Sequence, residues 1–167
     1  MVSEQAIPFA LALGANIGDR LAALRGACAA LGEVLTITAV SPVYETPPSY
    51  VTDQPAFLNA ALCGSTTLGP QVLLDQVKLI EQELGRRPTF RYGPRVIDID
   101  IVFYDAMTAQ TATLILPHPL MAEREFVLRP LAKIAPDWPH PVTGVTVAAM
   151  LAALSGPPTA RQIEATL

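Results

Sequence analysis

The sequence contains few of the residues that build disulfides or zinc sites. Only two of its 167 residues are cysteine and only two are histidine. Cys28 and Cys63 lie far apart in apolar segments and form no C-x-x-C pair, so we expect both to be reduced core residues. His118 and His140 have no second histidine or cysteine at ligand spacing, which argues against a zinc ion.

The sequence also lacks a strong excess of charge and a long apolar run. A net charge of −4 and a pI near 5.1 argue against a general affinity for nucleic acid or for an anionic membrane. The N-terminal apolar run, residues 6–13, is short, contains Pro8 and has no Lys or Arg before it. Neither a signal peptide nor a membrane span fits this pattern, so we expect a soluble, cytoplasmic protein.

No internal repeat, low-complexity tract or linker divides the chain. Hydrophobic residues make up 51% of it, enough to bury a real core, and the 16 prolines cluster in segments that we expect to be ordered loops. We therefore expect a single domain spanning residues 1–167.

Hydrophobic periodicity predicts the order β-α-β-β-α-β, which is typical of a ferredoxin-like α+β fold with helices packed on an antiparallel sheet. The second helix is the clearest element, because Gly69-Pro70 begins it, an apolar stripe follows, and Gly85 ends it. The expected strands are residues 7–13, 34–46, 57–67 and 96–104, and the expected helices are 19–31 and 70–84. A short strand near 110–116 and helices near 123–134 and 146–154 follow.

Two carboxylates interrupt an apolar strand in RYGPRVIDIDIVFYD, residues 91–105. Alternate side chains of a strand share a face, so Asp98 and Asp100 are expected to project from the same side. The predicted core face is Ile97, Ile99, Ile101 and Phe103, and the opposite face is Val96, Asp98, Asp100, Val102 and Tyr104.

Such a pair has a functional and a structural interpretation. Carboxylates about 7 Å apart on one face can bind one hard cation or bridge two, and Mg²⁺ prefers oxygen ligands of this kind. Alternatively, both aspartates simply lie on the solvated face of an antiparallel sheet. Aspartate is uncommon in strands, however, and two on one face repel unless cations neutralise them.

The ten residues before this strand supply such cations. Four of the eleven Lys and Arg residues fall there: Arg86, Arg87, Arg91 and Arg95. A solvated loop is one explanation. Guanidinium groups also bind phosphate oxygens in pairs, so an arginine loop beside a metal-binding carboxylate pair favours a polyphosphate substrate. No G-x-x-x-x-G-K-[ST] motif is present, so a P-loop kinase is excluded, and His118 is either a phosphate donor or a packed loop residue.

Phe57 and Asn59 lie two positions apart and are expected on one face of their strand. An aromatic ring beside an amide suits a flat heterocycle, which could stack on the ring while its edge pairs with the amide. Taken alone, the two residues also fit a core phenylalanine and a capping asparagine.

Six ordered segments resemble one family, the 6-hydroxymethyl-7,8-dihydropterin pyrophosphokinases (HPPK) of folate biosynthesis. They are LALGANIGDR, SPVYETPP, QPAFLNAAL, IEQELGRR, RYGPRVIDIDIVFYD and LPHPLMAEREFVLRPLAKIAPDWPHPVTG. The resemblance implies a ferredoxin-like fold and a magnesium-dependent transfer of pyrophosphate from ATP to the hydroxymethyl oxygen of the pterin, with release of AMP. It also implies two Mg²⁺ ions and a monomer that binds small molecules but neither nucleic acid nor membrane.

Matching the family's motifs also implies roles for individual residues. Asp98 and Asp100 are expected to hold the metal and, with Arg86 and Arg95, to be catalytic. The expected contacts to ATP are Arg86, Arg87, Tyr92, Arg95, His118 and Arg124. The expected contacts to the pterin are Thr46, Pro47, Ser49, Phe57, Asn59 and Phe126.

Several positions depart from the family's usual residues: Tyr92, Ala15, Leu120, Ala122, Thr113 and Ile115. They predict altered ATP binding but leave the metal ligands and the pterin contacts unchanged. Because one fold hosts many functions, two competing classes stay open. They are a non-catalytic small-molecule-binding module and a metal-dependent nucleotidyl- or phosphotransferase with another acceptor.

Overall fold

The computed structural model describes residues 2–86 and 89–167 and confirms the predicted order of the first six elements. Each apolar run forms the element that its period predicts, with one predicted strand divided in two. The elements are β1 (Val2–Ala15), α1 (Arg20–Val34), β2 (Thr36–Val40), β3 (Tyr44–Thr46), β4 (Phe57–Leu68), α2 (Pro70–Glu83) and β5 (Asp98–Tyr104). The hairpin β6 (Ala109–Gln110) and β7 (Ile115–Leu116), a 3₁₀ turn (Met121–Glu123), α3 (Glu125–Ile134), α4 (Val147–Ala152) and β8 (Arg161–Gln162) follow.

The main sheet has the strand order of a ferredoxin-like fold and is antiparallel throughout. Its order is β5-β1-β4-β3-β8, and β2 pairs with β4 alongside β3. Strand β5 therefore forms one edge, β2 and β8 lie at the other, and β1 and β4 fill the centre. The fold is α+β, as predicted.

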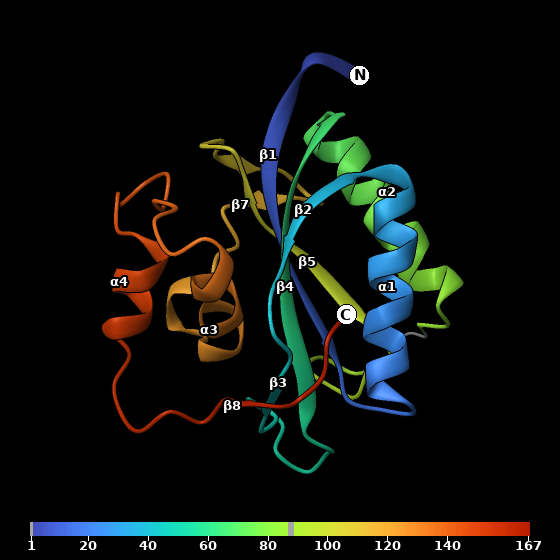
Figure 1. The fold of residues 1–167 in the computed structure, drawn as a ribbon, viewed down its shortest axis with the longest axis vertical. Coiled ribbons are helices and arrows are strands. Elements are labelled where there is room, and N and C mark those ends of the chain that lie inside the picture. The colour runs from blue at the N-terminus through green and yellow to red at the C-terminus, as the bar shows by residue number, and fades with distance from the viewer. Residues whose placement is uncertain (1, 87–88) are drawn as a thin grey trace.

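Helices cover both faces of this sheet (Figure 1). On one face, α1 and α2 pack over a core that includes Leu11, Leu24 and Val77. On the other face, α3 and α4 pack over a second core that includes Phe103 and Leu128. Burying both faces explains why the central strands are apolar on nearly every residue.

The predicted strand 34–46 is divided into β2 and β3, because Pro42 has no amide hydrogen for the sheet and interrupts the pairing. At the break, the backbone of Ser41 donates to the carbonyl of Ala61 and its hydroxyl accepts from the amide of Ala61. The break lets β3 end at Thr46 beside the cavity described below.

The predicted faces of β5 are right at its start and wrong at its end. Ile97, Ile99 and Ile101 pack against the α1–α2 core, as expected. The pairing of β1 with β5 then shifts by one residue, and this bulge exchanges the two faces. Phe103 therefore packs on the α3–α4 side, where it stacks with Trp138 at 5.0 Å, and Tyr104 packs on the α1–α2 side.

The structure also bears on membrane-spanning helices and on the state of Cys28 and Cys63. Within residues 2–86 and 89–167, no helix is long and apolar enough to cross a membrane. Both cysteines are free, and burial raises the pKa of each thiol to about 11, so they behave as small apolar residues at neutral pH.

Candidate active site

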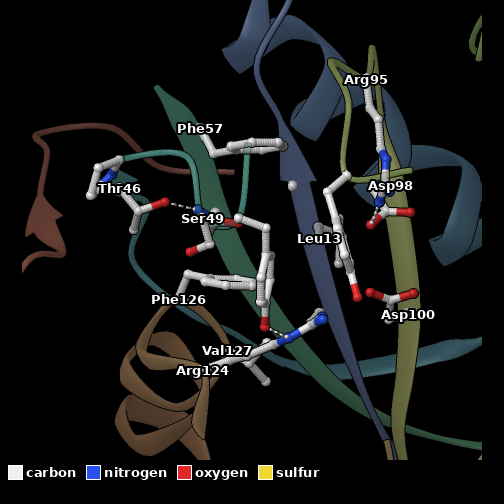
Figure 2. A pocket seen from close by; sticks show the side chains of 16 residues that line it. Leu13, Thr46, Ser49, Phe57, Arg95, Asp98, Asp100, Arg124, Phe126 and Val127 are labelled. Carbon is white, nitrogen blue, oxygen red and sulfur yellow. Dashed lines mark hydrogen bonds and ion pairs between the residues drawn. The ribbon is translucent and has the colours of Figure 1, made fainter. Parts of the chain in front are cut away.

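A cavity opens on the sheet face that carries α3, beside the first turn of that helix (Figure 2). Strands β1, β4 and β5 form its floor, and the loops that follow β3 and precede β5 form part of its sides. Eleven of the predicted site residues line it: Thr46, Pro47, Ser49, Phe57, Asn59, Tyr92, Arg95, Asp98, Asp100, Arg124 and Phe126.

One end of the cavity, the aromatic compartment, contains Phe57, Asn59, Thr46 and Phe126. Asn59 is only 4% exposed and donates through Nδ2 to the hydroxyl of Thr46 on the neighbouring strand, so its amide is held by the sheet. A Cβ at Gly14 would lie 2.9 Å from Asn59 Oδ1, so only glycine at that position leaves the amide room. Paired strands therefore position Phe57, Asn59 and Thr46, and α3 supplies Phe126.

Aromatic rings bound this compartment on opposite sides. Figure 2 shows Phe57 and Phe126 across the cavity from each other, with Thr46 and Ser49 between them at its edge. The guanidinium of Arg124 lies 5.5 Å from the ring centroid of Phe126 and 5.4 Å from that of Tyr50, and its Nε donates to the Tyr50 hydroxyl at 3.2 Å. Two facing rings with an amide at the side suit a flat, polar-edged ligand.

The other end of the cavity contains Asp98 and Asp100, which project from the same side of β5 (Figure 2). Asp98 accepts from Arg86 Nη1 at 3.0 Å through Oδ1 and from Arg95 Nη1 at 2.7 Å through Oδ2. We call Asp98, Asp100, Arg86 and Arg95 the acid–arginine cluster. The arginines of the loop thus neutralise the first aspartate, which answers how two acids are tolerated on one strand face.

Behind the cluster lies Glu81 of α2, whose side chain is 2% exposed. Its carboxylate accepts from Arg86 at 2.6 Å and from the backbone amide of Ile99 at 2.7 Å, and it lies 3.1 Å from Lys78 Nζ. A buried carboxylate with these partners is tied both to β5 and to the arginine loop. Glu81 therefore fixes the position of Arg86 relative to Asp98.

Arg95 is held by its backbone and leaves part of its guanidinium free. The side-chain Oδ1 of the buried Asn16 accepts from the backbone amide of Arg95 at 2.8 Å. The backbone amide of Asn16 donates to the backbone carbonyl of Arg95 at 3.0 Å. Among the described residues, Arg95 Nε is the buried side-chain donor for which no hydrogen-bond partner is found. A buried cationic donor without a partner at the wall of a cavity fits an anionic ligand.

The environment of Asp100 disfavours its ionised form. Burial and then the neighbouring Asp98 raise the pKa of Asp100 to about 7. Because 34% of the Asp100 side chain still faces open space, water moderates this effect. Without a cation, Asp100 therefore keeps its proton to a higher pH than an ordinary aspartate, while the Asp98 carboxylate is paired with two arginines.

His118 lies beside Asp100, with Nε2 at 3.9 Å from Oδ2. Burial and the charge of Arg124 lower the pKa of His118 to about 4, so the ring is neutral at pH 7 and the pair is not an ion pair. Its Nδ1 accepts from the amide of Leu120 at 3.3 Å, which places the proton on Nε2. The ring therefore presents a neutral N–H donor toward the aspartates.

The two loops at the cavity are joined to each other. Gln54 Nε2 donates to the carbonyl of Tyr92 at 2.8 Å, and its Oε1 accepts from Asn16 at 2.9 Å. The rings of Tyr50 and Tyr92 stack at 4.3 Å with an interplanar angle of 23°. These contacts connect the loop after β3 with the arginine loop over the cavity.

Two predicted residues lie beside the cavity rather than in it. Arg86 lines a neighbouring hollow, which Arg95 also lines, and His118 lines an apolar groove that includes Leu74, Ile115 and Asp100. The three hollows thus adjoin through Arg95 and Asp100. Arg87 lies outside the described residues.

The sequence interpretation missed Asn16, Tyr50, Gln54 and Glu81. Glu81 had a signal, because it lies four residues after Val77 and so on the apolar stripe of α2, where a carboxylate needs a buried partner. Asn16 and Gln54 act through contacts between segments about 40 residues apart, and no local pattern indicates them.

Fold and cavity together define a ferredoxin-like α+β domain with a two-part small-molecule site, one part aromatic and one part charged. Residues 10–136 match the family model described as 7,8-dihydro-6-hydroxymethylpterin-pyrophosphokinase (HPPK). The 2-amino-4-hydroxy-6-hydroxymethyldihydropteridine pyrophosphokinase of Bacillus subtilis is 48% identical over 126 residues, which cover 74% of this chain and 75% of that protein. The chain belongs to the HPPK family.

Longer relatives match as well. The folic acid synthesis protein FOL1 of Dictyostelium discoideum is 45% identical over 81% of this chain, yet the chain spans only 21% of that protein's length. Among solved structures, Plasmodium falciparum HPPK-DHPS A437G/K540E with pterin and p-hydroxybenzoate is 17% identical, with a TM-score of 0.70 over 89% of this chain and 43% of that one. This structural likeness supports the fold.

Proposed function

We propose that the protein is a 2-amino-4-hydroxy-6-hydroxymethyldihydropteridine diphosphokinase. It transfers pyrophosphate from ATP to 6-hydroxymethyl-7,8-dihydropterin and releases AMP. The observation that carries the proposal is that the aromatic compartment adjoins Asp98, Asp100 and Arg95 of the acid–arginine cluster in a single cavity. Two substrates bound at its two ends would have their reacting groups side by side, which is the main requirement of a transfer reaction.

The aromatic compartment is assigned to the pterin. The flat ring stacks between Phe57 and Phe126, and the edge that mixes N–H and carbonyl groups pairs with the amide of Asn59. Thr46, Pro47 and Ser49 line the same end and complete that edge. This orientation directs the hydroxymethyl group toward Asp98 and Asp100.

The acid–arginine cluster is assigned to the phosphates. Arg86 and Arg95 bind the phosphate oxygens, the free Nε of Arg95 supplies a further donor, and the neutral His118 donates through Nε2. Arg87, Tyr92 and Arg124 complete the proposed nucleotide contacts. We assign the adenine base to the groove that leads from Asp100 past Leu74 and Ile115, and because Thr113 and Ile115 line this groove, the ATP binding expected to be altered by these departures would be altered there.

Magnesium fits the donor set of Asp98 and Asp100, two hard carboxylate oxygens on one strand face. Among the described residues no group of three or more His, Cys, Asp or Glu side chains could hold a metal, so phosphate and water would have to supply the other ligands. Bound there, two Mg²⁺ ions would neutralise charge on the phosphates. Asp98 would have to exchange its arginine partners for a cation, which releases Arg86 and Arg95 for the phosphates.

In the proposed step, the pterin hydroxymethyl oxygen attacks the β-phosphorus of ATP. The bond from the β-phosphorus to the bridging oxygen of AMP breaks, and AMP leaves with that oxygen. Asp100 would accept the proton of the attacking hydroxyl, and a cation bound beside it would lower its pKa from the value near 7 of the metal-free site, which favours the ionised form that the role requires. The arginines stabilise the charge that develops on the transferred phosphates.

The test is a coupled assay of AMP release with and without Mg²⁺ and with and without the pterin. Release that requires both supports the assignment. Pterin binding without AMP release indicates a non-catalytic binding module, and release that another acceptor supports better than the pterin indicates a different phosphotransferase. A single domain over residues 1–167, a monomeric state and a cytoplasmic location remain part of the proposal.

A further inference from the structure

The C-terminal segment after α4, residues 155–167, crosses the molecule from α4 to β3. Figure 1 shows it, in red, leaving α4, running past α3 to β3 as the short strand β8, and ending near α1. It lies beyond the region that matches the family model, which ends at residue 136. We call this segment the strap.

The strap is attached first at α3. The carboxylate of Glu125 accepts from the amide of Thr159 at 2.9 Å, from its hydroxyl at 3.1 Å and from the amide of Ala160 at 2.9 Å. Burial raises the pKa of Glu125, but these hydrogen bonds and that from Arg129 outweigh it, so the net effect is a lowered pKa. The Glu125 carboxylate that holds the strap is therefore ionised at neutral pH. Glu125 stands between Arg124 and Phe126, which both line the cavity.

The strap is attached next at β3. Strand β8 pairs with the outer edge of β3, and the Ile163 amide donates to the carbonyl of Val43 at 2.9 Å. Arg161 contacts Glu45 at 2.8 Å, and the Ile163 side chain packs against the α1–α2 core. Strand β3 is three residues long and ends at Thr46, the partner of Asn59. Without β8, this short strand would be an unprotected edge.

We propose that the strap is a positioning element for the pterin end of the site. It ties the segment that carries Phe126 to the strand that carries Thr46, and these two form adjoining walls of the aromatic compartment. Glu125 and Glu45, which hold the strap, each lie one residue away from a cavity-lining side chain, so loss of either attachment removes a restraint on a wall of the compartment. A ring held between two aromatic faces is sensitive to displacement of either wall.

The proposal rests on the proposed function through its main readout, the KM for the pterin. Two variants detach the strap from different ends without changing a cavity residue: Glu125→Ala, which removes the acceptors of Thr159 and Ala160 at α3, and Ile163→Asp at the core. Each is expected to raise the KM for the pterin about tenfold while the KM for ATP changes by less than about twofold. Glu164→Gln, on an exposed position of the strap, and Arg129→Met, which removes another partner of Glu125 but no strap contact, are the matched controls.

A second readout does not depend on activity. In hydrogen–deuterium exchange, Ile163→Asp should speed exchange at the amides of residues 44–46 and 125–128 relative to the parent, while β1 stays protected. Equal loss of both KM values, or unchanged exchange at these two sites, would overturn the proposal. If the parent releases no AMP, the proposed function fails, and the exchange experiment alone then decides whether the strap holds the two walls.

Discussion

The two ends of the cavity are held by different forces. At the aromatic end, Asn59 and Thr46 lie on paired strands and share a hydrogen bond that is shielded from water. At the charged end, Asp98 is held by ion pairs to Arg86 and Arg95, both from the loop before β5. The aromatic end is thus formed by the fold, whereas the charged end is formed by groups that a ligand or a cation would have to separate.

This difference has a consequence for binding. A preformed, largely neutral compartment needs no rearrangement and should depend little on salt. A cluster in which arginines occupy both oxygens of Asp98 must exchange partners before that carboxylate can hold a cation. We therefore expect pterin binding to depend on shape and hydrogen bonds, and nucleotide binding to depend on ionic strength and on Mg²⁺.

The largest effect is expected from removing a carboxylate of the charged end. Asp98→Ala and Asp100→Ala should each lower AMP release by about a thousandfold. Each variant removes a carboxylate proposed to hold the Mg²⁺ that would stabilise the charge on the phosphates in the transition state. Pterin affinity, measured by calorimetry, should change little. Asp137→Asn, on an exposed loop, is the control. Unchanged AMP release in both alanine variants would refute the catalytic assignment.

The next effect concerns the support behind the charged end. Glu81→Ala should lower the free energy of unfolding by about 3 kcal/mol, because it removes a buried carboxylate that Arg86, Lys78 and the Ile99 amide all use. Urea unfolding measures the loss. Glu83→Ala, on an exposed position of the same helix, should cost well under 1 kcal/mol. Similar losses in the two variants would contradict the role of Glu81.

Local pattern was enough to predict most of the fold. The six leading elements follow from periods of two and of 3.6 residues and from turn signals such as Gly69-Pro70. The bulge in β5 was not predictable, because it arises from the pairing of β5 with β1. Residues 101–104 are all apolar or aromatic, so their sequence does not show which side chain faces which core. The two-residue strand β8 was missed for the same reason, since its partner lies more than 110 residues earlier.

The candidate site divides in the same way. Strand alternation placed Asp98 with Asp100 and Phe57 with Asn59, and all four line the cavity as expected. What the sequence could not indicate is how the loops meet, as in the contact of Gln54 with Tyr92 or the stack of Tyr50 on Tyr92. Such contacts depend on chain segments brought together only by the completed sheet. The roles of the individual residues stay predictions that the variants test.

A smaller effect is expected at the aromatic end. Asn59→Ala should weaken pterin binding by about 1 to 3 kcal/mol, because the ring edge loses a buried partner, and ATP binding should be unaffected. Isothermal titration calorimetry with each ligand separates the two. Ser65→Ala, farther along the same strand, controls for a general effect on β4. Equal weakening of pterin and ATP binding would show that the two ends are not independent.

The smallest effect is the pH dependence of stability that Asp100 contributes in the absence of metal. Its pKa lies near 7 in the folded chain and near 4 in the unfolded chain. Between these values the folded state keeps a proton that the unfolded state has lost, so this group lowers stability as pH rises from about 4 to 7. His118 acts in the opposite direction, because its pKa of about 4 in the folded chain lies below the ordinary value of 6.5.

Because the two groups oppose each other, the measurement must compare a variant with the parent. Asp100→Asn removes the unfavourable group, so its stability relative to the parent should increase between pH 4 and pH 7. Since the side chain is about a third exposed, water limits the gain to roughly 1 kcal/mol. Urea unfolding of both proteins at pH 4.5 and pH 7.5 in the presence of a chelator gives the difference. A difference that does not change with pH would mean that Asp100 ionises normally, and that the arginines neutralise both aspartates rather than Asp98 alone.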